Sequence, residues 1–195
     1  MKDKTPFALL QEWIEEEKQL GAPNPQQAVL STSTKEGAPH GRVVAIREIT
    51  DKGLLFFTQK GTRKVAELTD NPKASLTFWF ELKQREVMID ALVQVLEKHE
   101  NKEYWASYPR TAQTRFLAYA PTSGQPIESK QLLEDKKTAL EQTHEGQNIP
   151  FSSIYCGYRL EPNSFTFYSY RTDELSDVCR FTKHEDNWKQ ECMSP

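Results

Sequence analysis

The sequence predicts an α+β fold dominated by β-structure, with short antiparallel strands forming a barrel and a few helices flanking it. Two observations predict this class. Strand-like segments follow one another closely after an N-terminal helix, and they do not alternate regularly with helices as the strands of a parallel sheet do. The chain has 195 residues, of which 37% are hydrophobic and 27% charged. This length and composition predict a single globular domain, 1–195, with a full hydrophobic core.

The first expected element is an amphipathic helix within residues 1–21. Thr5 is a capping residue, and the following Pro6 is well tolerated in a first helical turn. The apolar residues recur at helical spacing, at Leu9, Leu10, Trp13 and Ile14. Prolines at positions 23 and 25 then favour an extended link to the first strand.

Runs rich in β-branched and aromatic residues, bounded by turn-forming stretches, predict the strands. The turns "TKEGAPHG" and "TDKG" separate the first three. The predicted strands are Ala28–Thr34, Gly41–Ile49, Leu54–Thr58, Ala74–Phe80, Glu86–Leu96, Ser153–Leu160, Ser164–Tyr170 and a final stretch through Phe181 and Trp188.

Three further helices are expected. They cover Thr62–Thr69, about Lys102–Ser107, and a segment from Ser129 to near Gly146. Residues 108–128 read as a long irregular loop, and loops of this length in compact domains are usually functional or disordered. Its aromatic residues argue against disorder, so we expect a long active-site loop.

The start of the helix at Thr62 has an unfavourable charge arrangement. With Thr62 as the N-cap, Arg63 and Lys64 lie in the first turn, where each cation meets the positive end of the helix dipole at a cost of about 0.3–1 kcal/mol. Two interpretations remain open. The helix is a solvated surface element whose charges are screened, or its N-terminus and the two cations bind a phosphate group.

Composition excludes several functions. The net charge is 25 − 28 = −3 without a basic block, so nucleic acid is not an expected partner. No apolar run approaches the roughly 20 residues that span a bilayer. The four histidines lack metal-ligand spacing, so no metal site is expected, and there is no GxSxG, P-loop or GxGxxG motif. Three cysteines without CxxC spacing, and no signal peptide, predict reduced thiols in a cytoplasmic protein.

Several windows, in order and at matching spacing, resemble the pyridoxamine 5′-phosphate oxidase family of FMN-binding split barrels. The similarity runs from "TPFALLQEWIEE" to "NWKQECMSP". It is most specific in "GRVVAIRE", "GLLFFTQKGTRKVAEL", "NPKASLTFWFELKQREVMIDA", "YWASYPRTAQ" and "GYRLEPNSFTFYSYR". The resemblance implies a six-stranded type of antiparallel split β-barrel with flanking helices, an FMN cofactor, and a homodimer with FMN at its interface.

The same resemblance assigns the cofactor residues. It implies that Arg63 and Lys64 hold the FMN phosphate together with Arg42, which suits the planar fork of arginine and the mobile charge of lysine. The remaining implied FMN contacts are Val43, Arg47, Phe57, Thr58, Glu86, Ser123 and Tyr168. Arg42 and Arg47 are an odd number of residues apart, so in a regular strand they point to opposite faces. If both touch one ligand, a bulge or a second subunit must intervene.

Other positions depart from the family pattern. Glu86 stands where the family has glutamine, and an ionised carboxylate only accepts hydrogen bonds. Tyr168 replaces a tryptophan, and Val178 replaces an arginine. In the loop that holds the substrate phosphate in the family, the matching residues are Tyr104, Tyr108 and Ala112, so an arginine and a serine hydroxyl are lost. Glu174 and Ser176 replace the arginine and histidine beside the substrate ring.

These losses favour an FMN-dependent oxidase acting on a small amine or reduced ring without a phosphate group, with oxygen as the electron acceptor. Losing one buried phosphate partner costs roughly 2–5 kcal/mol of binding. Arg47 and Tyr104 are the candidate catalytic residues, and Tyr108, Glu174 and Ser176 are candidate substrate contacts. A genuine pyridoxamine/pyridoxine 5′-phosphate oxidase is one alternative. A flavin-binding protein without turnover, or a scaffold without a cofactor, belongs to another class.

Overall fold

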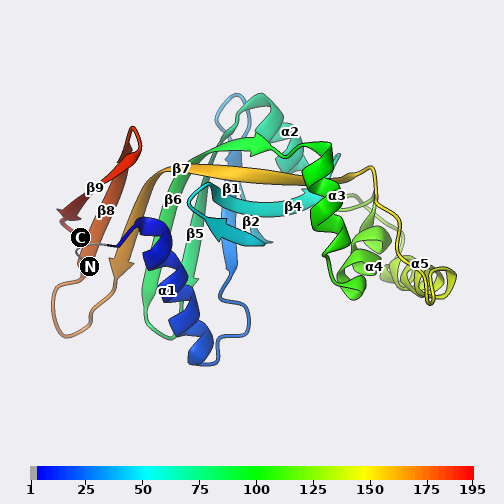
Figure 1. The fold of residues 1–195 in the computed structure, drawn as a ribbon, viewed down its shortest axis with the longest axis horizontal. Coiled ribbons are helices and arrows are strands. Elements are labelled where there is room, and N and C mark those ends of the chain that lie inside the picture. Colours follow the sequence, from blue (N-terminus) through cyan, green and yellow to red (C-terminus); the bar gives the residue numbers. More distant parts are fainter. Residues whose placement is uncertain (1–3) are drawn as a thin grey trace. The chain divides into compact units, whose positions relative to one another are not determined.

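The computed structural model describes residues 4–195 and is mostly β-structure (Figure 1). Its strands are β1 (Gln27–Ser33), β2 (Pro39–Ala45), β3 (Glu48–Thr50), β4 (Gly53–Gln59), β5 (Lys73–Phe80), β6 (Arg85–Val95), β7 (Tyr155–Ser169), β8 (Asp177–His184) and β9 (Asn187–Met193). Its helices are α1 (Pro6–Gln19), α2 (Arg63–Asp70), α3 (Lys98–Ala106), α4 (Arg110–Tyr119) and α5 (Lys130–Thr143).

The strands form one sheet in the order β2-β1-β5-β6-β7-β4-β3, and the β8–β9 hairpin extends it from β7. The pairs β1–β2, β1–β5, β3–β4, β5–β6, β7–β8 and β8–β9 are all antiparallel. The predicted class, a β-dominated antiparallel fold with flanking helices, is therefore confirmed. No helix in the described part of the chain is long and apolar enough to cross a membrane.

By its contacts the described chain divides into two compact units. The first comprises residues 4–56, 67–94 and 159–195, and the second comprises residues 57–66 and 95–158. The prediction that 1–195 is one domain remains a prediction.

The core of the first unit forms where α1 meets aromatic side chains of the sheet. Trp13 packs edge-on against Phe167, with ring centroids 5.0 Å apart, and Phe7 packs in the same way against Phe165 at 5.1 Å. The buried carboxylate of Glu17 accepts the backbone N–H of Lys83 at 2.7 Å. These contacts fix the predicted N-terminal helix. The first three residues of its expected range lie outside the described residues.

The core of the second unit is an aromatic cluster around Trp105 and Tyr155. The Trp105 indole N–H donates to the Ile149 carbonyl at 3.2 Å. The partly buried side chains packed against this cluster are Phe57, Tyr108, Phe116, Leu117 and Phe151.

Five segments differ from the sequence-based expectation. The final stretch through Phe181 and Trp188 is two strands, β8 and β9, with a turn between them, and the helix expected over about Lys102–Ser107 begins earlier, at Lys98. The strand expected over Gly41–Ile49 is divided into β2 and β3, because the Ile46 N–H still donates to Gln26 whereas the Arg47 N–H donates to Leu55. The two strands expected over 153–160 and 164–170 are one strand, β7. The loop expected over 108–128 is largely helical, since α4 occupies Arg110–Tyr119 within it.

Candidate functional site

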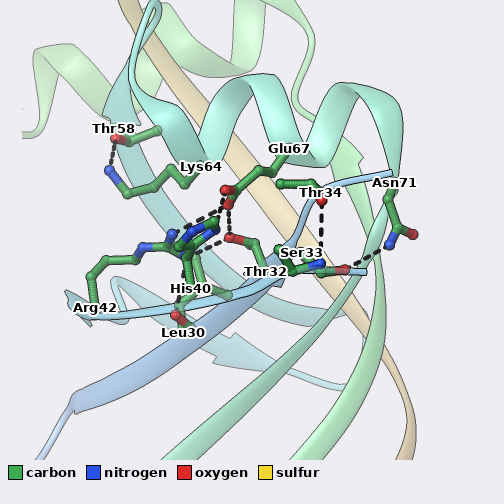
Figure 2. A network of polar contacts seen from close by, with 11 residues as sticks. Leu30, Thr32, Ser33, Thr34, His40, Arg42, Thr58, Lys64, Glu67 and Asn71 are labelled. Atoms are coloured by element: carbon green, nitrogen blue, oxygen red, sulfur yellow. Dashed lines mark hydrogen bonds and ion pairs between the residues drawn. The ribbon is translucent and has the colours of Figure 1, made fainter. Parts of the chain in front are cut away.

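Arg42 belongs to a polar network in the first unit (Figure 2). In the β1–β2 ladder Arg42 is paired with Leu30, and His40 with Thr32, so all four side chains share one face. Arg42 Nη1 donates to the Leu30 carbonyl at 3.1 Å and to the Thr32 hydroxyl at 2.5 Å. The guanidinium is therefore held on the core side of the sheet, with 21% of the Arg42 side chain exposed.

The anion of this network is Glu67, which lies on α2 and is 5% exposed. Its Oε2 accepts from Arg42 Nη2 at 3.3 Å and from the Thr32 hydroxyl, and its Oε1 lies 2.6 Å from His40 Nδ1. Burial alone raises the pKa of this carboxyl, but the Thr32 hydroxyl and the basic neighbours outweigh burial and hold the pKa below its ordinary value of 4.5. Glu67 is thus a buried carboxylate that remains charged.

The start of α2 belongs to the second unit and carries the two predicted phosphate-binding cations. Arg63 is exposed, and Lys64 donates from Nζ to the Thr58 hydroxyl at 3.2 Å (Figure 2). The Thr62 hydroxyl donates to the Gln59 carbonyl at 3.0 Å, while the Thr62 carbonyl accepts the N–H groups of the first turn. The predicted helix start is confirmed, and Thr58 and Lys64 lie in direct contact.

Phe57 and Tyr104 lie against the aromatic cluster of the second unit. Phe57 stacks on Tyr155, with centroids 5.0 Å apart and ring planes 8° apart, and its centroid is also 5.0 Å from that of Tyr104. Tyr108 lies 6.2 Å from Tyr155, measured between centroids. Ala112 is buried in α4 at 8% exposure. The candidate substrate residues of this unit are therefore carried by packed helices or their ends.

Two of the implied flavin-ring contacts, Glu86 and Tyr168, meet through Tyr170 in the first unit. The Tyr170 hydroxyl donates to Glu86 Oε2 at 3.1 Å, and the rings of Tyr168 and Tyr170 lie 4.2 Å apart. Burial and the adjacent Glu86 carboxylate raise the pKa of Tyr170. The structure therefore places a hydrogen-bond donor on the carboxylate that departs from the family pattern.

The remaining predicted residues lie at the surface. Val43 is 62% exposed, and Arg47 is exposed between β2 and β3. Glu174 Oε1 forms an ion pair with Arg171 Nε at 3.6 Å in the β7–β8 loop, where the Ser176 hydroxyl accepts the Arg171 N–H at 3.2 Å. Ser123 is half-buried in the turn after α4.

Four residues of these networks were not predicted from the sequence, namely Thr32, His40, Glu67 and Tyr170. Glu67 was detectable in principle, since it follows Lys64 by three residues on the predicted helix and therefore lies one turn along. The cross-strand pairing that brings Thr32 and His40 to Arg42 depends on register, which the sequence leaves undefined. In the described residues, no group of three or more histidine, cysteine, aspartate or glutamate side chains could hold a metal ion.

Comparison with known proteins identifies the family. Residues 14–144 match the family described as Pyridoxamine 5'-phosphate oxidase, and residues 155–195 match the Pyridoxine 5'-phosphate oxidase C-terminal dimerisation region. With the antiparallel sheet, these matches define the class as an FMN-dependent oxidase with a split-barrel fold. The chain belongs to the pyridoxamine 5′-phosphate oxidase family, which confirms the predicted resemblance.

Individual relatives support this assignment over nearly the whole chain. A Pyridoxine/pyridoxamine 5'-phosphate oxidase of Trichormus variabilis is 31% identical over 194 residues, covering 99% of this chain and 90% of the relative. A Pyridoxine/pyridoxamine 5'-phosphate oxidase of Alteromonas mediterranea is 32% identical over 193 residues, covering 98% of this chain and 90% of the relative.

Solved structures agree in fold. PhzG from Burkholderia lata 383, in complex with tetrahydrophenazine-1-carboxylic acid, has a TM-score of 0.88 at 26% identity and covers 100% of this chain and 94% of its own. A pyridoxamine 5'-phosphate oxidase-related, FMN binding protein from Nostoc punctiforme has a TM-score of 0.78 at 16% identity. The match covers 99% of this chain and 100% of the Nostoc chain. The second likeness supports the fold alone.

Proposed function

We propose that this chain binds FMN and oxidises a small amine or a reduced ring that carries no phosphate group, with oxygen as the final electron acceptor. The observation that carries the proposal is the contrast between the two ends of the implied site. The cations for the FMN phosphate are present, whereas the groups for a substrate phosphate are replaced.

Taken one by one, the residues implied for the FMN phosphate carry donors of the right chemistry. Arg42 offers a guanidinium held by β1, and Lys64 offers an ammonium beside the Thr58 hydroxyl at the start of a helix. Charged donors of this kind, with a helix N-terminus, favour a phosphate dianion. Bound FMN would supply the hydride-accepting chemistry, while the protein supplies binding, orientation and electrostatics.

The proposal of a substrate without phosphate rests on two changes at the implied substrate positions. Ala112 carries a methyl group that donates no hydrogen bond, and Glu174 carries a carboxylate where the family has an arginine. PhzG, crystallised in complex with tetrahydrophenazine-1-carboxylic acid, provides a precedent for a ring ligand without phosphate in the same fold. Tyr104 and Tyr108 remain as aromatic contacts for such a ring, and Arg47 is the proposed cationic group near ring and substrate.

We also propose a homodimer with FMN at its interface. On the sheet face opposite Arg42, the register aligns Val43, Val29, Thr77 and Met88 across β2, β1, β5 and β6. Three of these are large apolar residues that are 62%, 41% and 38% exposed in the order Val43, Val29 and Met88. Such a row on a single chain favours burial against a partner, and residues 155–195 match a dimerisation region.

The two faces of the sheet give this dimer a role in the site. Arg42 lies on the face of Leu30, whereas Glu86 lies on the opposite face with Met88. Within one copy the two side chains therefore point to opposite sides of the sheet. In a homodimer, Arg42 of one copy and Glu86 of the other can face the same ligand.

The first experiment is a visible absorption spectrum of the purified protein before and after addition of FMN, compared with an Arg63→Ala/Lys64→Ala variant. We expect a flavin spectrum in the wild type that weakens in the variant. A wild-type protein that takes up no FMN would contradict the cofactor assignment.

A second experiment tests the substrate class. The FMN-loaded protein is mixed anaerobically with pyridoxamine 5′-phosphate, with unphosphorylated amines, or with reduced-ring acids, and loss of flavin absorbance is followed before air is admitted. We expect bleaching by an unphosphorylated compound. The 31% identity to a named pyridoxine/pyridoxamine 5′-phosphate oxidase favours the phosphorylated vitamin as the alternative. Absence of bleaching by every compound would favour a binding protein without turnover.

A further inference from the structure

Glu67 is a buried carboxylate that the proposed function does not use directly. It is the anion of the Arg42 network, and its two oxygens contact Thr32, Arg42 and His40. A charged group this deeply buried is costly unless it is paired and hydrogen-bonded. Because Glu67 lies beside the proposed phosphate-binding arginine, we asked whether it affects how Arg42 binds the phosphate.

We propose that Glu67 and Thr32 are positioning residues that orient the Arg42 guanidinium for the phosphate of FMN, an inference that rests on the proposed function. Arg42 has five N–H donors. Within residues 4–195, its bonds to Leu30, Thr32 and Glu67 use both hydrogens of Nη1 and one of Nη2. The Nε–H and the second hydrogen of Nη2 stay available, and together they form a fork that suits two phosphate oxygens.

The energetic reason is preorganisation. A free arginine side chain loses considerable rotamer freedom when it binds a ligand. Three bonds to β1 and α2 fix the Arg42 side chain before the ligand arrives, so less freedom is lost on binding. The carboxylate also places negative charge near the phosphate, and this repulsion opposes the gain. Preorganisation predicts that Glu67 increases the affinity for FMN, whereas charge repulsion predicts that it decreases the affinity. The direction of the change in Glu67→Gln therefore decides between the two effects.

The test compares FMN with riboflavin, which lacks the phosphate, by quenching of flavin fluorescence. Wild-type protein, Glu67→Gln, Thr32→Val, Arg42→Ala and the Glu67→Gln/Arg42→Ala double variant are titrated with both ligands. We expect Glu67→Gln to weaken FMN binding about tenfold, as for one lost charge-assisted bond, without changing riboflavin binding. In the Arg42→Ala background the same substitution should have no further effect. The exposed Glu36→Gln on the β1–β2 turn is the matched control.

Three results would overturn the inference. Equal weakening of FMN and riboflavin would make Glu67 a merely structural residue, and tighter FMN binding in Glu67→Gln would make it a competitor of the phosphate. If the wild type itself does not bind FMN, the proposed function fails together with this inference. The wild-type titration alone distinguishes this outcome from the other two. If Glu67→Gln does not fold, Thr32→Val carries the same prediction, since it removes one bond to Arg42 while keeping the side-chain shape.

A separate observation concerns two cysteines of the C-terminal hairpin. Cys179 of β8 and Cys192 of β9 are directly paired in the antiparallel register, so both side chains lie on one face. In an antiparallel hairpin with a two-residue turn such as Glu185–Asp186, the pair next to the turn is of the hydrogen-bonded type, and the two types of pair alternate outward from it. Cys179–Cys192 is consequently a non-hydrogen-bonded pair, with Cα atoms about 4.5 Å apart.

We infer that Cys179 and Cys192 form a reversible cross-strand disulfide when hydrogen peroxide is the oxidant. The spacing falls within the range that a disulfide spans without backbone movement. Cys192 is exposed and Cys179 is buried, so Cys192 is the thiol that meets the oxidant. Its thiolate attacks the peroxide O–O bond to give a sulfenic acid and water. The Cys179 thiol then displaces a second water as the S–S bond forms, so two thiols lose two electrons and two protons.

Mass spectrometry after treatment with hydrogen peroxide tests this inference. We expect loss of two hydrogens within the peptides that contain Cys179 and Cys192, reversal by dithiothreitol, and the same loss in the control variant Cys156→Ser. Cys192→Ser should abolish it. Addition of oxygen atoms to Cys192 without a crosslink, or a crosslink between two chains, would overturn the inference.

Discussion

Phe57 is oriented by a glycine opposite it. A Cβ atom built on Gly157 would lie 2.4 Å from Cε1 of Phe57 and 2.7 Å from Cδ1 of Leu96, closer than real Cβ atoms come. The Phe57 ring can stack on Tyr155 only because position 157 has no side chain. The ring of Phe57, a residue implied in cofactor binding, is thus positioned by the close approach of the Gly157 backbone. Motif matching does not reveal this contact.

Gly157→Ala should destabilise the protein by about 1–3 kcal/mol, because the added methyl forces the Phe57 ring and its neighbours apart. The free energy of unfolding in urea measures the effect. Gly41→Ala is the control, since its Cβ would lie 3.5 Å from Cγ1 of Val29, an ordinary contact. Equal stability of Gly157→Ala and the wild type would show that the cluster repacks without cost.

Glu67 also predicts a pH dependence of stability. Its pKa in the folded protein lies below 4.5, so its ionisation contributes stability that is fully present above the unfolded value and is lost as pH falls through the folded pKa. Glu67→Gln should therefore be less sensitive than the wild type to acid below about pH 4.5. Urea unfolding from about pH 7 to about pH 3 measures this, with Glu36→Gln as control. Parallel curves for wild type and Glu67→Gln would contradict the prediction.

At the scale of elements, Asn101 connects the start of α3 to β7. Its buried side chain donates to the carbonyls of Leu96 and Glu97, both at 3.0 Å, and accepts the Gly157 N–H at 2.6 Å. One amide therefore satisfies three backbone groups. This contact fixes the helix that carries Tyr104.

Asn101→Leu should cost about 1–3 kcal/mol for each backbone group left buried without a partner. It should also loosen the Tyr104 end of α3. Thermal unfolding reports the first effect and intrinsic fluorescence of Trp105 the second. The neighbouring exposed Lys102→Ala should change neither. An unchanged melting temperature in Asn101→Leu would mean that water replaces the amide.

The elements that the sequence predicted well are those with a strong local pattern. The helix at Arg63, the helix after Ser129 and most strands lie where apolar spacing and turn residues indicated. The long strand β7 was missed because Pro162 and Asn163 resemble a turn, although Pro162 is buried inside the strand. Helix α4 was missed because its polar residues gave no clear period. It buries Gln113 and Thr114, and Gln113 donates to the Trp105 carbonyl.

Some residues of the candidate site could be predicted from the sequence, and others could not. The residues implied by family motifs, such as Arg42 and Lys64, could be named from sequence because their types and order are distinctive. Their partners could not be named, since Thr32 and His40 reach Arg42 through the register of β1 and β2. Register is defined by packing across the sheet rather than by local pattern. Tyr170 meets Glu86 for the same reason, from a strand far along the chain.

At the scale of the whole molecule, the proposed homodimer explains the apolar row on the exposed sheet face. Val43→Lys/Met88→Lys should shift the protein from dimer toward monomer, because two buried ammonium groups in each copy would lack partners. Light scattering coupled to size-exclusion chromatography measures the mass. FMN affinity should fall in parallel if the flavin lies at the interface. The control is Leu175→Lys, in a loop where the leucine is 89% exposed. A wild-type monomer, or a dimer unaffected by the double variant, would contradict the assigned face.

The burial of Glu67 against Arg42 also bears on how this family could diverge. A lineage that lost the need for a phosphate ligand could not simply discard the arginine, since an unpaired carboxylate would then stay inside the protein at a cost of several kcal/mol. Loss of the glutamate alone would also be costly, because Arg42 would lose its ion pair with α2. We therefore expect positions 42 and 67 to covary among relatives, with the arginine accompanied by an acceptor on the helix and its loss accompanied by an apolar replacement there.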